Sequence, residues 1–221
     1  MPSFSRAPGT MVPMTILLSD PRVGAIPVLE CGEPLVTLGP ALGPARARVR
    51  AELALRLQEA SGLLPDGISL QVVEGHRSEV VQRQIIARYS SEVAAAHPGI
   101  GAADLERLTS RFVSPIDVAP HVAGAAVDLT LVDANSDEVD LGTPIDATPE
   151  ESDSACYFAS PDISAAARTN RATLAAALEA AGLVNYPTEW WHWSYGDRYW
   201  ALVTGAPAAH YGPVDDREAV A

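Results

Sequence analysis

The sequence of 221 residues contains no lysine, since all fifteen of its basic residues are arginines. The absence of lysine excludes mechanisms that depend on a lysine nucleophile or a Schiff base. Basic residues are also few beside the 28 acidic ones, which gives a formal net charge of −13. Nucleic acids and anionic membrane surfaces bind basic patches, so we expect neither as a partner.

Cysteine and long apolar runs are scarce as well. Cys31 and Cys156 are too few for a disulfide scaffold or a cysteine-based zinc ribbon, and the sequence leaves open whether they form one bridge or remain ordinary thiols. The apolar stretch from Met11 to Leu18 is interrupted by Pro13 and has no basic flank. It is too short to span a bilayer and makes a poor signal peptide, so we expect a cytoplasmic enzyme.

The composition is that of a globular chain, with 48% hydrophobic and 19% charged residues. We predict a flexible leader over 1–19, a single domain over 20–214 and a frayed tail over 215–221. Helical spacing or capping signals predict helices over 44–61, 78–96, 102–108 and 161–182. Strands are expected over 68–73 and 125–132, and as an adjacent pair within 189–203. This order predicts an α+β fold in which helices flank a small antiparallel sheet.

Two segments carry candidate metal ligands: HVAGAAVD, from His121 to Asp128, and EWWH, from Glu189 to His192. Asp128 stands in the middle of an apolar strand, where a lone carboxylate costs several kcal/mol unless it is paired or binds a metal. An arginine could pair with it instead, and both histidines could be structural. In a regular strand Glu189 and His192 would point to opposite faces, so a bulge between them is needed to bring them together.

The segments EGHRS, HVAGAAVDLTL, DLGTPID and NYPTEWWHWSYGD resemble, in this order, the VanX-type D-alanyl-D-alanine dipeptidases of the zinc D,D-peptidase group. With DPRVGAIPVLECGEPLV near the start, the resemblance extends from about Asp20 to Pro213. It implies that the sheet carries a zinc site. The implied zinc ligands are His121, Asp128 and His192, which would leave a fourth position open for water.

The resemblance also implies roles for other residues. Glu189 corresponds to the general base, and Arg77 to the cation that stabilises the oxyanion, although Arg77 could instead form a salt bridge with Glu74 or Glu79. Asp140, in DLGTPID, is expected to hold the ammonium group of the substrate, the alternative being a solvated loop charge. Asp146, in the same segment, is expected to be structural.

The chain departs from the family pattern close to these positions. Ala119 stands where the family commonly has a serine two residues before the first ligand. His76 and Ser78 replace a tyrosine and a proline beside the arginine, and Glu74 replaces an aspartate. These changes concern substrate contacts more than metal binding.

The expected function is zinc-dependent hydrolysis of small D,D-dipeptides such as D-Ala-D-Ala, within cell-wall metabolism. One alternative is a D,D-carboxypeptidase that acts on longer cell-wall peptides. Another is a zinc-bearing binding module without activity, against which the presence of both Glu189 and Arg77 argues. The sequence decides neither the preferred dipeptide nor the oligomeric state.

Overall fold

The structure, a computed structural model, describes residues 15–214; the predicted tail and residues 1–14 of the predicted leader lie outside this range. The elements are α1 (Pro21–Ala25), β1 (Leu35–Thr37), η1 (Pro40–Leu42), β2 (Arg48–Arg50), α2 (Ala51–Ser61), β3 (Ser69–Glu74), α3 (Glu79–Ala96), α4 (Ala102–Thr109), η2 (Ile116–Val118), β4 (Ala126–Val132), α5 (Ala165–Ala180), β5 (Val184–Asn185), β6 (His192–Ser194) and α6 (Arg198–Thr204). The order of helices and strands confirms the predicted α+β class.

The main sheet is small and antiparallel, with the strand order β3-β4-β6-β5, while β1 and β2 form a separate antiparallel pair. In the main sheet Asp128 on β4 lies opposite Glu74 on β3 and opposite His192 on β6. The register therefore places three polar residues, distant in sequence, in one row across the sheet.

The two faces of β4 have different surroundings. Val127, Leu129 and Leu131 belong to the main core, together with buried residues of α2 and α5. Because side chains alternate along a strand, Asp128 and Thr130 point to the other face. Every residue of β4 is buried, so the second face is also covered by protein.

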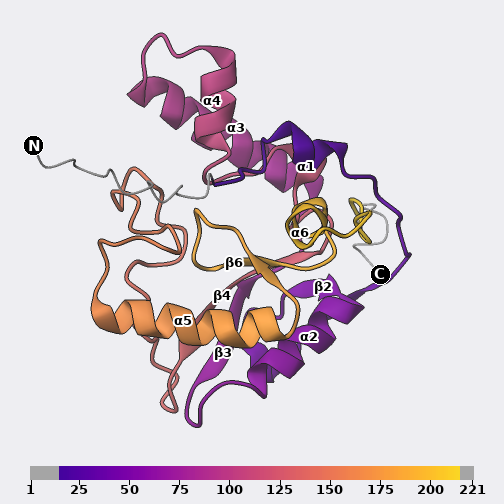
Figure 1. Ribbon diagram of the computed structural model, residues 1–221, viewed down its shortest axis with the longest axis vertical. Helices are drawn as coiled ribbons and strands as arrows, with labels where there is room; N and C mark the ends of the chain where they lie inside the picture. The colour runs from indigo at the N-terminus through magenta and orange to yellow at the C-terminus, as the bar shows by residue number, and fades with distance from the viewer. Residues whose placement is uncertain (1–14, 215–221) are drawn as a thin grey trace, which may run out of the picture.

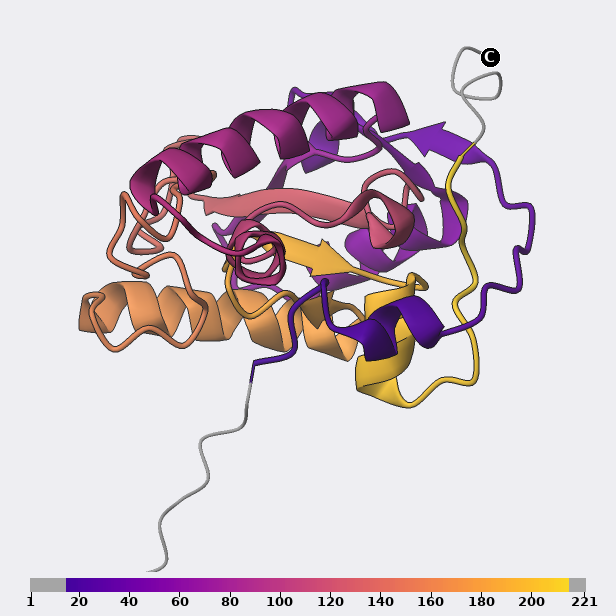
Figure 2. The same cartoon turned by 90° about the horizontal axis from the view of Figure 1, so that it is seen from above.

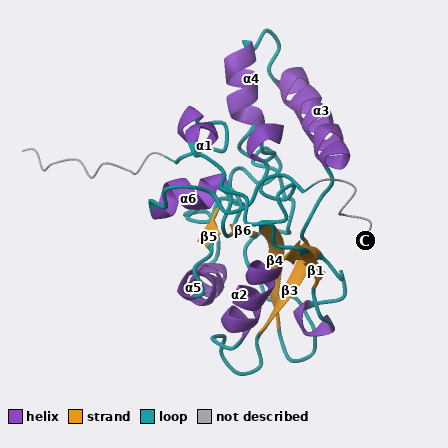
Figure 3. Cartoon of the chain, turned by 90° about the vertical axis from the view of Figure 1, so that its right-hand side faces the viewer, coloured by secondary structure: helices purple, strands orange, loops and turns teal. Residues whose placement is uncertain are grey.

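Helices α3 and α4 cover this second side. They form a helical lobe at one end of the molecule, away from α2 and α5 (Figures 1 and 3). Tyr89 and Val93 of α3 pack there against Val113, which follows α4. Seen from above, α3 runs along one side of the molecule and α5 along the other, with β4 and β6 between them (Figure 2).

The sequence-based prediction of a second strand within 189–203 is wrong. Only residues 192–194 form a strand there, and α6 begins at Arg198. Asp197 is the reason, because its side chain accepts hydrogen bonds from the backbone N–H groups of Tyr199 and Trp200 and so caps a helix.

Two further observations concern the composition. Cys31 is exposed, Cys156 is buried, and both are free thiols. Within residues 15–214, every helix is too short or too polar to cross a membrane.

Candidate metal centre

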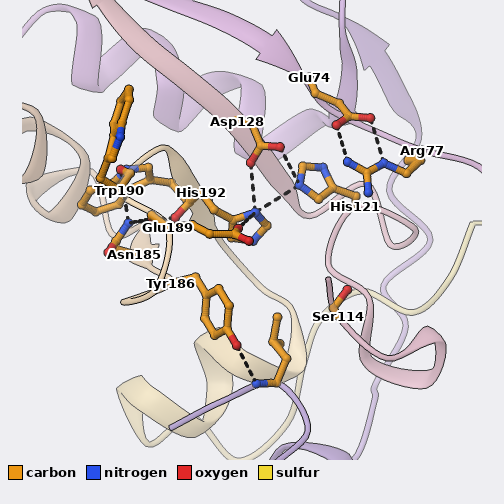
Figure 4. A network of polar contacts seen from close by, with 12 residues as sticks. Glu74, Arg77, Ser114, His121, Asp128, Asn185, Tyr186, Glu189, Trp190 and His192 are labelled. Atoms are coloured by element: carbon orange, nitrogen blue, oxygen red, sulfur yellow. Dashed lines mark hydrogen bonds and ion pairs between the residues drawn. The ribbon is translucent and has the colours of Figure 1, made fainter. Parts of the chain in front are cut away.

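His121, Asp128 and His192 converge on one point beneath the second face of the sheet (Figure 4). The Nε2 atom of His121 lies 3.3 Å from Asp128 Oδ2 and 3.1 Å from Nδ1 of His192. Nδ1 of His192 lies 3.0 Å from Asp128 Oδ1. All three side chains are buried.

The tautomer of His121 follows from its other ring nitrogen. Nδ1 lies 2.8 Å from the carbonyl oxygen of Gly75. A carbonyl only accepts, so Nδ1 carries the hydrogen and the Nε2 lone pair of the neutral ring points toward Asp128 and His192. This is the arrangement of metal-binding histidines, whose second nitrogen donates to a carbonyl or carboxylate.

The three ligand atoms fit a tetrahedral cation. Ligands about 2.0–2.1 Å from a zinc ion in tetrahedral geometry lie about 3.3 Å from one another, close to the separations above. Two imidazole nitrogens and one carboxylate oxygen are also zinc's usual donors, and three protein ligands are typical of a catalytic site. Within residues 15–214, Asp128 forms ion pairs with these two histidines and with no arginine.

The electrostatics agree with a site built for a cation. Burial would raise the pKa of Asp128, but His121 and His192 outweigh burial and lower it. Burial lowers the pKa of His192, which favours the neutral ring that a metal needs. Burial would lower the pKa of His121, but the charge of Asp128 outweighs burial and raises it. The space between these side chains therefore attracts positive charge, which either a proton or a metal ion can supply.

Glu189 reaches the centre through a turn and not through a bulged strand. Its N–H donates to Tyr186 O, and the N–H of His192 donates to Glu189 O. Asn185 donates from its side-chain amide to the carbonyls of Glu189 and His192, which holds this turn. The Glu189 carboxylate thereby lies 3.8 Å from Nδ1 of His192, and only 6% of the residue is exposed.

Burial raises the pKa of Glu189 well above its usual value, and the charges of Asp128 and Asp146 add to this effect. A carboxylate with a raised pKa is able both to take and to return a proton near neutral pH.

Arg77 forms the ion pair with Glu74 that the sequence left open. Its Nε donates to Glu74 Oε1 at 2.8 Å, and Nη2 pairs with the other carboxylate oxygen. A third bond runs from Nη1 to the Gln82 side chain. A guanidinium has five N–H groups, so two of them remain for a ligand.

A cavity of about 390 Å³ opens onto these groups. Five of the six predicted site residues line it: His121, Asp128, His192, Glu189 and Arg77. Asp140 does not; its carboxylate accepts hydrogen bonds from the Gly142 N–H and the Ser164 hydroxyl. Asp146 lines the cavity in its place.

Comparison with known proteins agrees with this geometry. The model of the D-Ala-D-Ala dipeptidase family, Peptidase_M15, matches residues 43–207. The chain belongs to this family. It is therefore a metallopeptidase, and the recognition made from the sequence motifs is confirmed.

Two curated D-alanyl-D-alanine dipeptidases are similar to this member of the family. One, from Synechocystis, is 28% identical over 217 residues, covering 80% of this chain and 87% of the relative. The other, from Escherichia coli, is 36% identical over 72 residues, covering 33% of this chain and 35% of the relative.

Two solved structures also match at lower similarity. A mutant of the vancomycin resistance D,D-pentapeptidase VanY in complex with Zn(II) has 19% identity and a TM-score of 0.39, covering 74% of this chain and 78% of its own. VanYB in complex with D-Alanine-D-Alanine has 20% identity and the same TM-score, covering 74% and 77%.

In this member of the family, contacts that the sequence did not reveal hold the connection on which Asp146 lies. The buried Arg171 of α5 donates to four carbonyl oxygens of the long connection between β4 and α5, those of Leu141, Ala155, Tyr157 and Phe158. Trp190 adds a hydrogen bond from its indole N–H to the Thr143 hydroxyl. The connection is thus fastened to the elements that carry Glu189 and His192.

Sequence reasoning missed several polar residues that line the cavity, among them Gln82 and Ser114, and it expected Asp146 to be structural. Gln82 offered one signal, since it is a polar residue one helical turn after the Ser78 cap, but its burial depends on the lobe. Asp146 shared its motif with Asp140, and nothing local distinguished the two carboxylates.

Proposed function

We propose that the chain is a zinc-dependent dipeptidase that hydrolyses D,D-dipeptides such as D-Ala-D-Ala. The observation that carries this proposal is the convergence of His121, Asp128 and His192 in one cavity with Glu189 and Arg77. Membership in the D-Ala-D-Ala dipeptidase family supports the substrate class.

His121, Asp128 and His192 would hold the zinc ion. When bound, zinc acts as a Lewis acid on the peptide carbonyl and makes water more acidic. Glu189 takes the proton of the attacking water and returns it to the leaving amine, a role for which its raised pKa is suited. Arg77 donates its two remaining N–H groups to the oxygen on which negative charge develops.

Glu74 has a part in this scheme because it fixes the guanidinium plane of Arg77. Two parallel N–H···O bonds between these side chains restrict the arginine to one orientation. The negative charge of Glu74 offsets the positive charge of Arg77, so Arg77 acts mainly as an oriented hydrogen-bond donor.

We assign the ammonium group of the substrate to Asp146 and not to Asp140. Asp146 lines the cavity, and burial together with the charges of Asp128 and Glu74 raises its pKa to about 6. A carboxylate surrounded by other carboxylates is stabilised by a cationic ligand. An ammonium group satisfies this need only when the N-terminus of the substrate is free, which favours dipeptides over longer chains.

The test is a hydrolysis panel on the zinc-loaded protein. D-Ala-D-Ala should be cleaved much faster than L-Ala-L-Ala, N-acetyl-D-Ala-D-Ala or an acylated tripeptide. Metal analysis should find about one zinc per chain, and His192→Ala should lose it. Preferred cleavage of the acylated tripeptide would establish a D,D-carboxypeptidase instead, and zinc binding without cleavage of any substrate would establish a binding module.

A further inference from the structure

The cavity has a second polar wall, built by the helical lobe. Gln82, Arg88 and Tyr89 of α3 contribute to it, and Ser114 joins them from the segment between α4 and η2. Figure 4 shows Ser114 below His121 and Arg77, with its hydroxyl turned upward. The proposed mechanism gives no task to this hydroxyl.

The Gln82 side chain determines how Ser114 presents its hydroxyl. Only 1% of Gln82 is exposed. Its amide oxygen accepts from Arg77 Nη1 at 3.0 Å, and its NH₂ group donates to the Ser114 carbonyl at 3.0 Å and to Ser114 Oγ at 3.2 Å. The amide cannot be reversed, because Arg77 only donates and the Ser114 carbonyl only accepts.

Ser114 Oγ therefore uses a lone pair to accept a hydrogen from Gln82. Its own hydrogen needs another acceptor, and within residues 15–214 none lies at hydrogen-bond distance. The residue is half-buried and borders the cavity. The hydroxyl is thus prepared to donate to a ligand, close to the N–H groups of Arg77 that are also free to donate.

The charges around the cavity indicate which end of a dipeptide meets this donor. Asp146 and Glu151 border it from the long connection and attract an ammonium group. In the wall near Ser114 the acids are paired, Glu74 with Arg77 and Glu92 with Arg88 at 3.9 Å. A carboxylate therefore meets less repulsion at Ser114 than beside Asp146 and Glu151, and it finds the Ser114 hydroxyl as a donor.

Resting on the proposed function, we propose that Ser114 is a specificity-determining residue: its hydroxyl, oriented by Gln82, donates a hydrogen bond to the C-terminal carboxylate of the dipeptide. Gln82 is the positioning residue, since it holds both Ser114 and Arg77. The site would then select substrates whose two ends are both free, one bound at each wall.

The test compares D-Ala-D-Ala with its C-terminal amide in steady-state kinetics of the zinc-loaded enzyme. Ser114→Ala should raise KM for D-Ala-D-Ala about 10- to 100-fold, the range for a hydrogen bond to a charged group, while kcat changes little. Turnover of the amide should be almost unaffected, so the preference for the free acid falls. Ser114→Thr keeps the hydroxyl and should keep most of the preference.

Ser91→Ala is the matched control, since Ser91 lies on α3 with an exposed hydroxyl bonded to Ala87 O. If Ser114→Ala changes KM equally for D-Ala-D-Ala and its amide, or changes neither, the role of Ser114 is overturned while the dipeptidase proposal stands. If the parent enzyme cleaves neither substrate, the proposed function falls and the Ser114 assignment falls with it.

Discussion

At the scale of single residues, the three residues that could hold a metal are distinct from the residue proposed as the general base. Glu189 lies 3.8 Å from a ligand nitrogen but is not part of the convergent set of three. Its burial and raised pKa come from the turn that places it beside Asp128 and Asp146. Its removal should therefore affect turnover and not metal content.

Glu189→Gln keeps the shape of the side chain and loses the ability to accept a proton. We expect full zinc content and a loss of about 10² to 10⁴ in kcat, the usual contribution of general base catalysis. Zinc analysis and D-Ala-D-Ala hydrolysis measure the two effects. Glu179→Gln, an exposed position on α5, should leave both unchanged. A loss below about tenfold in Glu189→Gln would remove the residue from the base role.

Asp146 and Asp140 allow a direct comparison of two identical substitutions in one connection. Asp146→Asn should weaken the binding of free dipeptides about 10- to 100-fold, because a charge-assisted hydrogen bond is lost. N-acetylated dipeptides should change little. Asp140→Asn should leave KM for both unaltered, since Asp140 lies outside the cavity. A selective loss in Asp140→Asn would restore the role that the sequence motif predicted.

The raised pKa of Asp146 also has a consequence for stability. The folded protein holds this proton to about pH 6 and the unfolded chain only to about pH 4, so stability falls as pH rises through this window. In metal-free protein, Asp146→Asn should be more stable than the parent above pH 6 and equal to it near pH 4. We expect a stability difference of less than about 1 kcal/mol, because Asp146 is only partly shielded in the cavity and solvent still screens its charge. Thermal unfolding at both pH values measures the difference, which added zinc should reduce.

At the scale of secondary-structure elements, the sequence predicted most segments whose signals are local. Ser78 caps α3 as predicted, and β3 and β4 follow their apolar patterns within one or two residues. Three segments were predicted less well. The helix expected over 44–61 begins only at Ala51, because Arg48–Arg50 form β2. Helix α5 begins at Ala165 because Ser164, and not Pro161, provides the cap. The aromatic run after Glu189 gave no periodic signal for its turn.

The placement of Asp146 shows where local reasoning ends. Asp146 lies on a connection that Arg171, 25 positions later, holds through backbone carbonyls. Every residue has a backbone carbonyl acceptor, so no sequence pattern predicts such bonds. The candidate metal ligands were predictable for another reason, because their segments resemble the family pattern, whereas the residue types alone left an arginine salt bridge and structural histidines open.

Gly75, between β3 and the Arg77 loop, connects an element boundary to the metal centre. A Cβ atom there would lie 2.6 Å from the Arg48 carbonyl oxygen, while the Gly75 carbonyl holds His121. Gly75→Ala should cost about 1–3 kcal/mol of stability through overpacking. It should also weaken zinc binding about 10- to 100-fold, because it moves the Gly75 carbonyl that bonds His121.

Thermal unfolding and competition with a chelator measure the two effects of Gly75→Ala. Gly101→Ala is the control, since a Cβ at Gly101 meets no atom within 4 Å. Unchanged zinc affinity in a destabilised Gly75→Ala protein would show that the glycine serves packing only.

At the scale of the whole molecule, the cavity lies between the helical lobe and the long connection, which Glu150 helps to join. Glu150, on the long connection, accepts a hydrogen bond from Tyr89 of α3 at 2.7 Å and pairs with Arg111 after α4. Tyr89 borders the cavity on the lobe side, and Thr148 and Glu151 border it on the side of the connection. The contact of Glu150 therefore sets how closely the two walls approach.

Glu150→Ala removes this link without touching the metal ligands. We expect a loss in stability near 1 kcal/mol, because the carboxylate is 38% exposed. The larger effect should be local: hydrogen exchange in α3 and α4 should accelerate, and KM for D-Ala-D-Ala should rise several-fold, since the substrate must then bring the walls together itself. Zinc content should not change. Glu138→Ala removes an exposed acid from the same connection and should show none of these effects. If exchange in the lobe stays at the parent rate while KM rises, Glu150 acts on the substrate directly, and other contacts, such as that of Tyr157 with Arg111, hold the two walls together.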